Sequence, residues 1–311
     1  MKFGLASGML WGLSTVVLSI ALGIAPFLDA PEAAVASAFL HDAACAIILF
    51  VYMGARRRLK DTWAAVKTRS GRAVMLGAIL GGPLGMTGYL IAINNIGPGY
   101  TAVISSFYPA VGSLLAYVFL KERMRVGQIV ALFVALTGVI VMSWSSTDAA
   151  SGGAALLGVA AALLCVVGWG SEAVILAWGM RDEAVDNETA LHIRETTSGV
   201  VYALVVLPIF SVAGFAVKAG TSPAMGVVAL AAVAGTASYL FYYKAIDTIG
   251  ASRGMALNIS YSAWAVLFGL ILIGTVPTPL VIVCCIAILI GTVLAASPNW
   301  RELSWRELSW R

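Results

Sequence analysis

The sequence predicts an all-α integral membrane protein with ten transmembrane helices, arranged as two inverted five-helix repeats. Of its 311 residues, 60% are hydrophobic and 11% are charged, whereas roughly a quarter of the residues are charged in an ordinary soluble domain. A chain this apolar needs the bilayer as its solvent, and its backbone must then be satisfied within helices or a closed barrel. The apolar stretches are about 20 residues long and lack the alternation of strands, which indicates helices.

Turn signals or polar loops separate ten apolar stretches. Pro26 and Pro31 follow the first stretch, Gly97-Pro98-Gly99 divides the third from the fourth, and Pro277 and Pro279 precede the last. Glycine and proline interrupt regular helices, so each of these positions is a boundary. The predicted helices cover residues 4–24, 32–53, 72–95, 99–119, 126–145, 154–178, 188–212, 223–247, 250–274 and 278–297.

Arginine and lysine gather in the loops after the second and the fourth predicted helices. These cations are Arg56, Arg57, Arg58, Lys60, Lys67, Arg69 and Arg72, then Lys121, Arg123 and Arg125. Basic loops lie on the cytoplasmic side of a membrane protein, so both termini are expected there. The same loops account for the net charge of +4, and the expected partner is the lipid bilayer with no nucleic acid.

A shift of about 153 residues aligns the two halves of the chain. Each half contains five predicted helices, and because five is odd the second half crosses the membrane in the opposite orientation to the first. The shift places AINNIG (92–97) on AIDTIG (245–250), Tyr108 on Tyr261, His41-Asp42 on Arg194-Glu195 and, with five further residues, Trp11 on Trp169. We expect repeats over residues 1–147 and 148–298. The repetitive tail 299–311, NWRELSWRELSWR, is either an interfacial segment or a vector-derived extension, and it carries no functional argument.

Glu172 ends the motif GWGSE (168–172) inside the sixth predicted helix. A carboxylate at the bilayer centre costs about 2.5–3.5 kcal/mol on insertion scales, and such residues face a cavity, pair with a cation or carry protons. Inverted repeats place a binding site near the midplane, where the two halves meet. We therefore predict that Glu172 is a counter-ion for substrate, with a structural ion pair or proton transfer as the alternatives.

Aromatic side chains accompany this carboxylate along the chain. Trp169 lies three residues before Glu172 on the same helical face, and Trp11 is its counterpart in the first repeat. Helices eight and nine add Tyr239, Tyr261 and Trp264. A trimethylammonium group offers no N–H donor, but ring faces attract it by as much as about 2 kcal/mol each when desolvated. These residues predict an aromatic cage for an organic cation, although any one ring could instead fill the core or anchor the interface.

A second polar set occupies repeat-related positions in the second and seventh predicted helices. This set consists of two pairs of sequence neighbours, His41-Asp42 and Arg194-Glu195. We interpret them first as ion pairs or hydrogen-bonded pairs that hold these two helices together. The sharper alternative is a proton relay or substrate contact, because histidine titrates near neutral pH.

The chain resembles the ten-helix EamA-type members of the drug/metabolite transporter superfamily. The fourth helix with its flanks carries the general signature, NNIGPGYTAVISSFYPAVGSLLAYVFLKERM (94–124). More specific blocks resemble the bacterial choline permeases of the LicB type, namely FLHD (39–42), GGPLGM (81–86), GWGSE (168–172), SYLFYYKAI (238–246) and LNISYSAWAVLF (257–268). The resemblance implies a quaternary ammonium substrate and a place in the bacterial inner membrane.

The sequence therefore predicts a secondary active or facilitative transporter of choline or a closely related quaternary ammonium cation, working by alternating access. Proton coupling remains open, and no cofactor and no metal are expected. The alternative is a broad exporter of amino acids or drugs, although a zwitterion would need a partner for its own carboxylate and Arg194 is the candidate within the spans. An intramembrane enzyme is less well supported, because the spans lack HExxH and GxSxG motifs.

Overall fold

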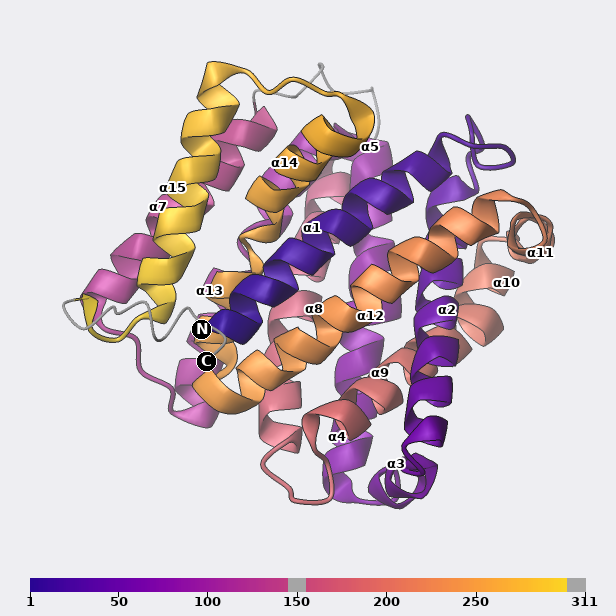
Figure 1. The fold of residues 1–311 in the computed structure, drawn as a ribbon, viewed down its shortest axis with the longest axis horizontal. Helices are drawn as coiled ribbons and strands as arrows, with labels where there is room; N and C mark the ends of the chain where they lie inside the picture. Colours follow the sequence, from indigo (N-terminus) through magenta and orange to yellow (C-terminus); the bar gives the residue numbers. More distant parts are fainter. Residues whose placement is uncertain (145–154, 301–311) are drawn as a thin grey trace.

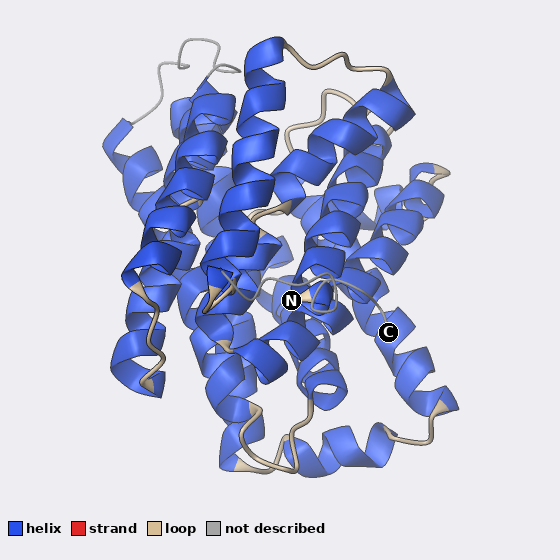
Figure 2. Cartoon of the chain, turned by 60° about the vertical axis from the view of Figure 1, so that its left-hand side comes forward, coloured by secondary structure: helices blue, strands red, loops and turns tan. Residues whose placement is uncertain are grey.

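The computed structural model describes residues 1–144 and 155–300, and this part of the chain contains helices and no strand (Figures 1 and 2). This part of the chain contains nine helical spans that are long and apolar enough to cross a membrane, judged by length and composition. Some of these spans join consecutive helical elements, such as Arg69–Gly97 and Ala251–Ile273. The seventh predicted helix, 188–212, is helical as well, but it is interrupted and carries buried charge. It consists of α9 (Asn187–Val201), the π-helix η3 (Tyr202–Val206) and α10 (Leu207–Ile209). The predicted repeat boundary and the tail from residue 301 lie outside the described residues.

The other helices follow the predicted spans closely, except for two short ones over residues 59–65 and 213–220, which lie between predicted helices. In chain order they are α1 (Lys2–Leu22), α2 (Ala33–Ala55), α3 (Leu59–Ala65), α4 (Arg69–Ile79), the π-helix η1 (Leu80–Gly85), α5 (Met86–Ser105), α6 (Tyr108–Leu115), the π-helix η2 (Ala116–Leu120), α7 (Val126–Trp144), α8 (Ala155–Gly179), α11 (Ala213–Gly220), α12 (Ala224–Ile249), α13 (Ala251–Asn258), α14 (Tyr261–Ile273) and α15 (Pro279–Ala296).

Helix packing repeats between the two halves. The first helix of the chain, α1, packs along α12 and α14, and the corresponding helix of the second half, α8, packs along α4, α5 and α6. The last helices of the halves, α7 and α15, lie side by side, and α2 packs on α9 (Figure 1). Each half thus places its first helix against the third and fourth helices of the other, which is the arrangement expected of an inverted repeat.

Two glycines with positive φ break the helices at equivalent places. Gly97 within α5 has φ 81° and ψ 161°, and Gly250 between α12 and α13 has φ 90° and ψ 163°. This region of backbone space is essentially restricted to glycine. The Glu122 carboxylate accepts hydrogen bonds from the amides of Ala251 and Ser252 at 2.9 and 3.0 Å, so the loop after η2 supports the second break.

Two further glycines let the halves approach closely at the centre of the bundle. A Cβ atom added to Gly12 of α1 would lie 2.8 Å from the carbonyl oxygen of Tyr261. One added to Gly170 of α8 would lie 3.0 Å from the carbonyl oxygen of Tyr108. Small residues permit such backbone contacts in membrane helices, and the matched pair repeats one helix crossing in both halves.

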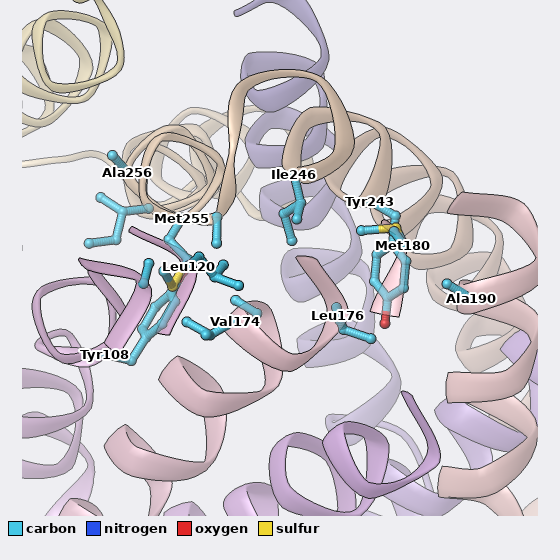
Figure 3. Packing of buried hydrophobic residues seen from close by; sticks show 14 of the residues in the cluster. Tyr108, Leu120, Val174, Leu176, Met180, Ala190, Tyr243, Ile246, Met255 and Ala256 are labelled. Atoms are coloured by element: carbon cyan, nitrogen blue, oxygen red, sulfur yellow. The ribbon is translucent and has the colours of Figure 1, made fainter. Parts of the chain in front are cut away.

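Buried side chains from both halves form one large cluster at the centre (Figure 3). Tyr108 comes from α6, Val174 and Leu176 from α8, Tyr243 from α12 and Met255 from α13. The cluster holds α8 between elements of both repeats, and α8 carries the GWGSE motif.

Salt bridges tie the two halves together at one end of the bundle. Arg58, after α2, contacts Asp186 at 2.8 Å and Glu188 at 2.6 Å, next to the start of α9. Hydrogen bonds from Thr189 and Arg58 lower the pKa of Asp186 although burial, the largest influence, opposes ionisation. Both loops therefore lie at the same end of the bundle, as the alternation of predicted helices requires.

Candidate functional site

Glu172 projects from α8 toward the π-helix η1, which carries the sequence LGGPLG. A Cβ atom added to Gly81 would overlap the second carboxylate oxygen of Glu172. The glycine therefore makes room for the carboxylate, and no larger residue fits there without movement. Single π-helical turns within α-helices occur frequently at functional sites, and here the turn faces the one acidic residue of α8.

Arg194 of α9 contacts three carboxylates at once. Its Nε donates to Glu172 at 3.0 Å, and its Nη1 lies 2.9 Å from Glu195 and 3.5 Å from Asp42. The predicted adjacent pair Arg194-Glu195 is thus in direct contact, but the same guanidinium also reaches the other half of the protein. The two repeat-related pairs meet in one cluster, in which Asp42 of α2 contacts Arg194 of α9.

The charges in this cluster do not balance. Three carboxyl groups surround one guanidinium, so the acidic groups of the cluster outnumber its permanent cation. The Glu172 and Asp42 side chains keep 13% and 14% exposure, whereas Glu195 is fully buried. An approaching cation thus meets Glu172 and Asp42 first, because they are the carboxylates that solvent reaches.

His41 and Asp42 connect the cluster to α1. Asp42 accepts a hydrogen bond from Ser198 at 2.6 Å and lies 3.5 Å from His41 Nδ1. The other ring nitrogen of His41 lies 3.3 Å from Ser14 Oγ. These contacts form a continuous polar path from α1 through α2 to α9. His41 and Asp42 are adjacent on α2 and point in different directions, so His41 reaches α1 and Asp42 reaches α9.

Two aromatic groups flank the cluster, and each contains one of the repeat-related tryptophans. In the first, Trp169 stacks on Tyr89 at 5.5 Å, meets the edge of Tyr108 at 5.7 Å, and donates from Nε1 to the Gly81 carbonyl at 3.0 Å. In the second, Trp11 lies 5.0 Å from Tyr239. No ring contact joins Trp11 and Trp169 within the described residues, so the two tryptophans belong to separate aromatic groups.

The ring of Tyr239 also holds the arginine. The guanidinium carbon of Arg194 lies 4.8 Å from the centre of this ring, and Nη2 lies 3.4 Å from its hydroxyl. A cation within about 6 Å of an aromatic centre is attracted by the ring face. The site therefore combines a carboxylate and an aromatic face around a cation, and in this structure that cation is Arg194.

The family model of EamA-like transporters matches the chain twice, over residues 1–144 and 156–297. The chain belongs to the EamA-like transporter family. It is 30% identical over 201 residues to Protein LicB of Haemophilus influenzae. The match covers 63% of this chain and 65% of LicB, slightly less than two thirds of that relative's length. A crystal structure of a protein with 18% identity has the same fold, with a TM-score of 0.71 over 97% of this chain and 98% of the other.

The remaining predicted residues of this EamA-like protein lie at the edge of the site. Trp264 packs its Cβ against Gly12 of α1, and its Nε1 is buried without a hydrogen-bond partner among the described residues. Tyr261 begins α14, and its carbonyl oxygen lies against Gly12 of α1. No direct contact joins Trp264 or Tyr261 to Glu172 in the part of the chain that the structure describes.

Sequence reasoning missed Tyr89 and Tyr108, which enclose Trp169. The repeat carried the signal, because the shift that aligns Tyr108 with Tyr261 also aligns Tyr89 with Tyr242. Tyr89 and Tyr108 lie in the apolar helices α5 and α6, and a lone tyrosine in such a helix is usually interpreted as a core or interface residue. In residues 1–144 and 155–300, no three His, Cys, Asp or Glu side chains are arranged so that they could hold a metal ion.

Proposed function

We propose that this EamA-like protein carries choline or a closely related quaternary ammonium cation across the bacterial inner membrane by alternating access. The observation that carries the proposal is the excess of carboxylates: Asp42, Glu172 and Glu195 surround the single guanidinium of Arg194. Buried charge of one sign is costly unless it is paired. A monovalent cation reduces that imbalance, whereas an anion increases it.

Aromatic rings next to the carboxylates favour a cation without N–H donors. Trp169 is enclosed by Tyr89 and Tyr108, and Trp11 lies against Tyr239. Ring faces bind methylated ammonium groups, and an acid balances their charge without directional contacts. The residues proposed to bind substrate are Glu172, Trp169, Trp11, Trp264, Tyr239 and Tyr261, together with Tyr89 and Tyr108.

Orientation and coupling belong to the same proposal. The basic loops after α2 and η2 favour cytoplasmic termini, and the family matches favour repeats over residues 1–147 and 148–298, with the tail 299–311 outside them. His41, Asp42, Arg194 and Glu195 are the candidate residues for proton coupling, because they form the continuous polar path from α1 to α9.

A zwitterion or amino-acid exporter is less favoured by the site. Its substrate carboxylate would need Arg194, and three carboxylates already surround that guanidinium. A fourth carboxylate would add repulsion at short range.

The test is uptake of labelled choline into proteoliposomes by the native chain, Glu172→Gln and the control Glu183→Gln, whose residue is exposed in the loop after α8. We expect saturable uptake that unlabelled tetramethylammonium inhibits, with loss in Glu172→Gln and none in the control. A native chain that transports amino acids but neither binds nor transports choline would refute the proposal. Repeating the uptake with and without a pH gradient separates proton coupling from facilitated transport.

A further inference from the structure

We propose that Arg194 is a tethered cation that occupies the substrate site when it is empty, and that an incoming cation displaces it from Glu172. This inference rests on the proposed function. It assigns to Arg194 a part in the transport cycle, as an internal competitor of substrate.

The guanidinium stands where a substrate cation is expected to bind. It lies 3.0 Å from the Glu172 carboxylate and 4.8 Å from the centre of the Tyr239 ring. These are the counter-ion and the aromatic face that would hold a quaternary ammonium group. Arg194 and a substrate cation therefore compete for the same two groups.

The arginine retains acidic partners when it leaves Glu172. Its Nη1 already contacts Glu195 at 2.9 Å and Asp42 at 3.5 Å. The second carboxylate oxygen of Glu195, Oε2, is buried and accepts no hydrogen bond from the described residues. This oxygen can receive the N–H that Glu172 releases, so the displaced guanidinium does not become an unpaired buried charge.

Helix geometry permits the small movement that displacement requires. The π-helix η3 (Tyr202–Val206) begins in the helical segment directly after α9. A π-turn loosens the regular hydrogen-bond ladder, and such turns are frequent at functional sites. On the facing element, Gly82 of η1 packs against Ser198, since a Cβ there would lie 2.5 Å from the serine hydroxyl. A shift of α9 is therefore coupled to the π-helix that also accommodates Glu172.

The exchange of cations has a consequence for transport. When the empty carrier reorients its binding site with Glu172 unpaired, an uncompensated charge lies in a low-dielectric environment. Arg194 pairs with Glu172 during that return, whereas substrate does so during the loaded step. Removal of Arg194 should therefore impair the empty return more than the exchange of bound substrate.

The experiment compares net choline uptake with choline counterflow in proteoliposomes, for the native chain, Arg194→Gln and the exposed control Arg125→Gln. We expect Arg194→Gln to retain counterflow and to lose net uptake by at least about tenfold. Arg194→Gln should bind choline about tenfold or more tightly at equilibrium. In the native chain Arg194 fills the site most of the time, and the apparent affinity for choline is then the intrinsic affinity multiplied by the small fraction of free sites. Arg125→Gln should match the native chain in all three measurements.

A parallel fall of net uptake and counterflow, or weaker choline binding in Arg194→Gln, would overturn the inference and make Arg194 a positioning residue for Glu172. Arg194→Gln leaves three carboxylates without a cation, so the variant Arg194→Gln/Glu195→Gln restores the native charge balance if the single variant does not fold.

The native chain supplies an independent readout in the ¹⁵N resonance of the Arg194 Nε–H, assigned by its loss in Arg194→Lys. Saturating choline should shift it. Choline binding without that shift would refute displacement alone, whereas absence of choline binding to the native chain would refute the proposed function itself.

Discussion

The Nε of Arg194 donates to the Glu172 carboxylate at 3.0 Å, and this contact joins α9 to the GWGSE motif of α8 across a separation of 22 residues. Arg194 is 4% exposed and is surrounded by acidic groups from α2, α8 and its own helix. Arg194 and Glu195 are neighbours on α9, but Glu172 and Asp42 reach this guanidinium only when α8 and α2 pack against α9. The charge of the site is thus a property of the assembled fold.

Substitution of Trp169 by phenylalanine should separate the hydrogen bond of the indole from its ring face. Trp169→Phe removes the donor to the Gly81 carbonyl, which should reduce stability by about 1–2 kcal/mol through an unpaired buried acceptor. Choline affinity should fall about threefold, since tryptophan is the strongest cation–π ring. The measurements are thermal unfolding in detergent and choline binding. Trp63→Phe, at an exposed position of α3, is the control, and equal effects in both variants would argue against a role for Trp169.

Gly81 should tolerate no side chain. The added methyl group of Gly81→Ala would collide with the Glu172 carboxylate, so the carboxylate must move and choline affinity should drop by at least about tenfold, or 1.4 kcal/mol. Gly226→Ala is the matched control on α12, because no atom lies within 4 Å of the added Cβ. Choline titration of both variants checks the prediction, and native affinity in Gly81→Ala would show that Glu172 does not need this space.

The two helix breaks should differ in their sensitivity to alanine. Gly97→Ala should cost about 1–3 kcal/mol of folding free energy from backbone strain alone. Gly250→Ala should cost more, since its Cβ would also lie 2.9 Å from the Glu122 carboxylate group that bonds the Ala251 and Ser252 amides. Thermal or denaturant unfolding of the two variants measures the order. An equal loss would mean that Glu122 moves aside without cost.

Asp186 should make stability depend on acid pH. Its pKa is lowered in the folded protein, so its stabilising contribution is complete above the unfolded-state pKa and disappears as the pH falls through the lower folded-state value. The melting temperature of Asp186→Asn should therefore lie below that of the native chain at pH 7, and the two should converge once the pH falls below the folded-state pKa of Asp186. Glu183→Gln, on the same loop and exposed, is the control. A difference that persists at the lowest pH would assign the effect to lost hydrogen bonding by Asp186 instead of its charge.

The sequence predicted the ten helical segments to within a few residues, and it predicted the break at Gly97 but did not single out Gly250. It also predicted that α1 and α8 are counterparts, and their packing against opposite halves confirms the inverted arrangement. For the site, it selected Glu172, Trp169, Arg194 and Asp42 as chemically unusual, and these four lie in or beside one cluster. Their roles in substrate binding remain predictions.

Segment length, the repeat and the places where helices break were determined by the sequence itself. The reason is physical: about 20 apolar residues are needed to cross the hydrocarbon core, and positive φ at a break demands glycine. The pairing of Arg194 with Glu172, and the enclosure of Trp169 by Tyr89 and Tyr108, were decided by the tertiary structure. Helices that are apolar on every side carry no periodic signal for which face meets which neighbour, so only the packing of all ten segments selects the partners of each buried charge.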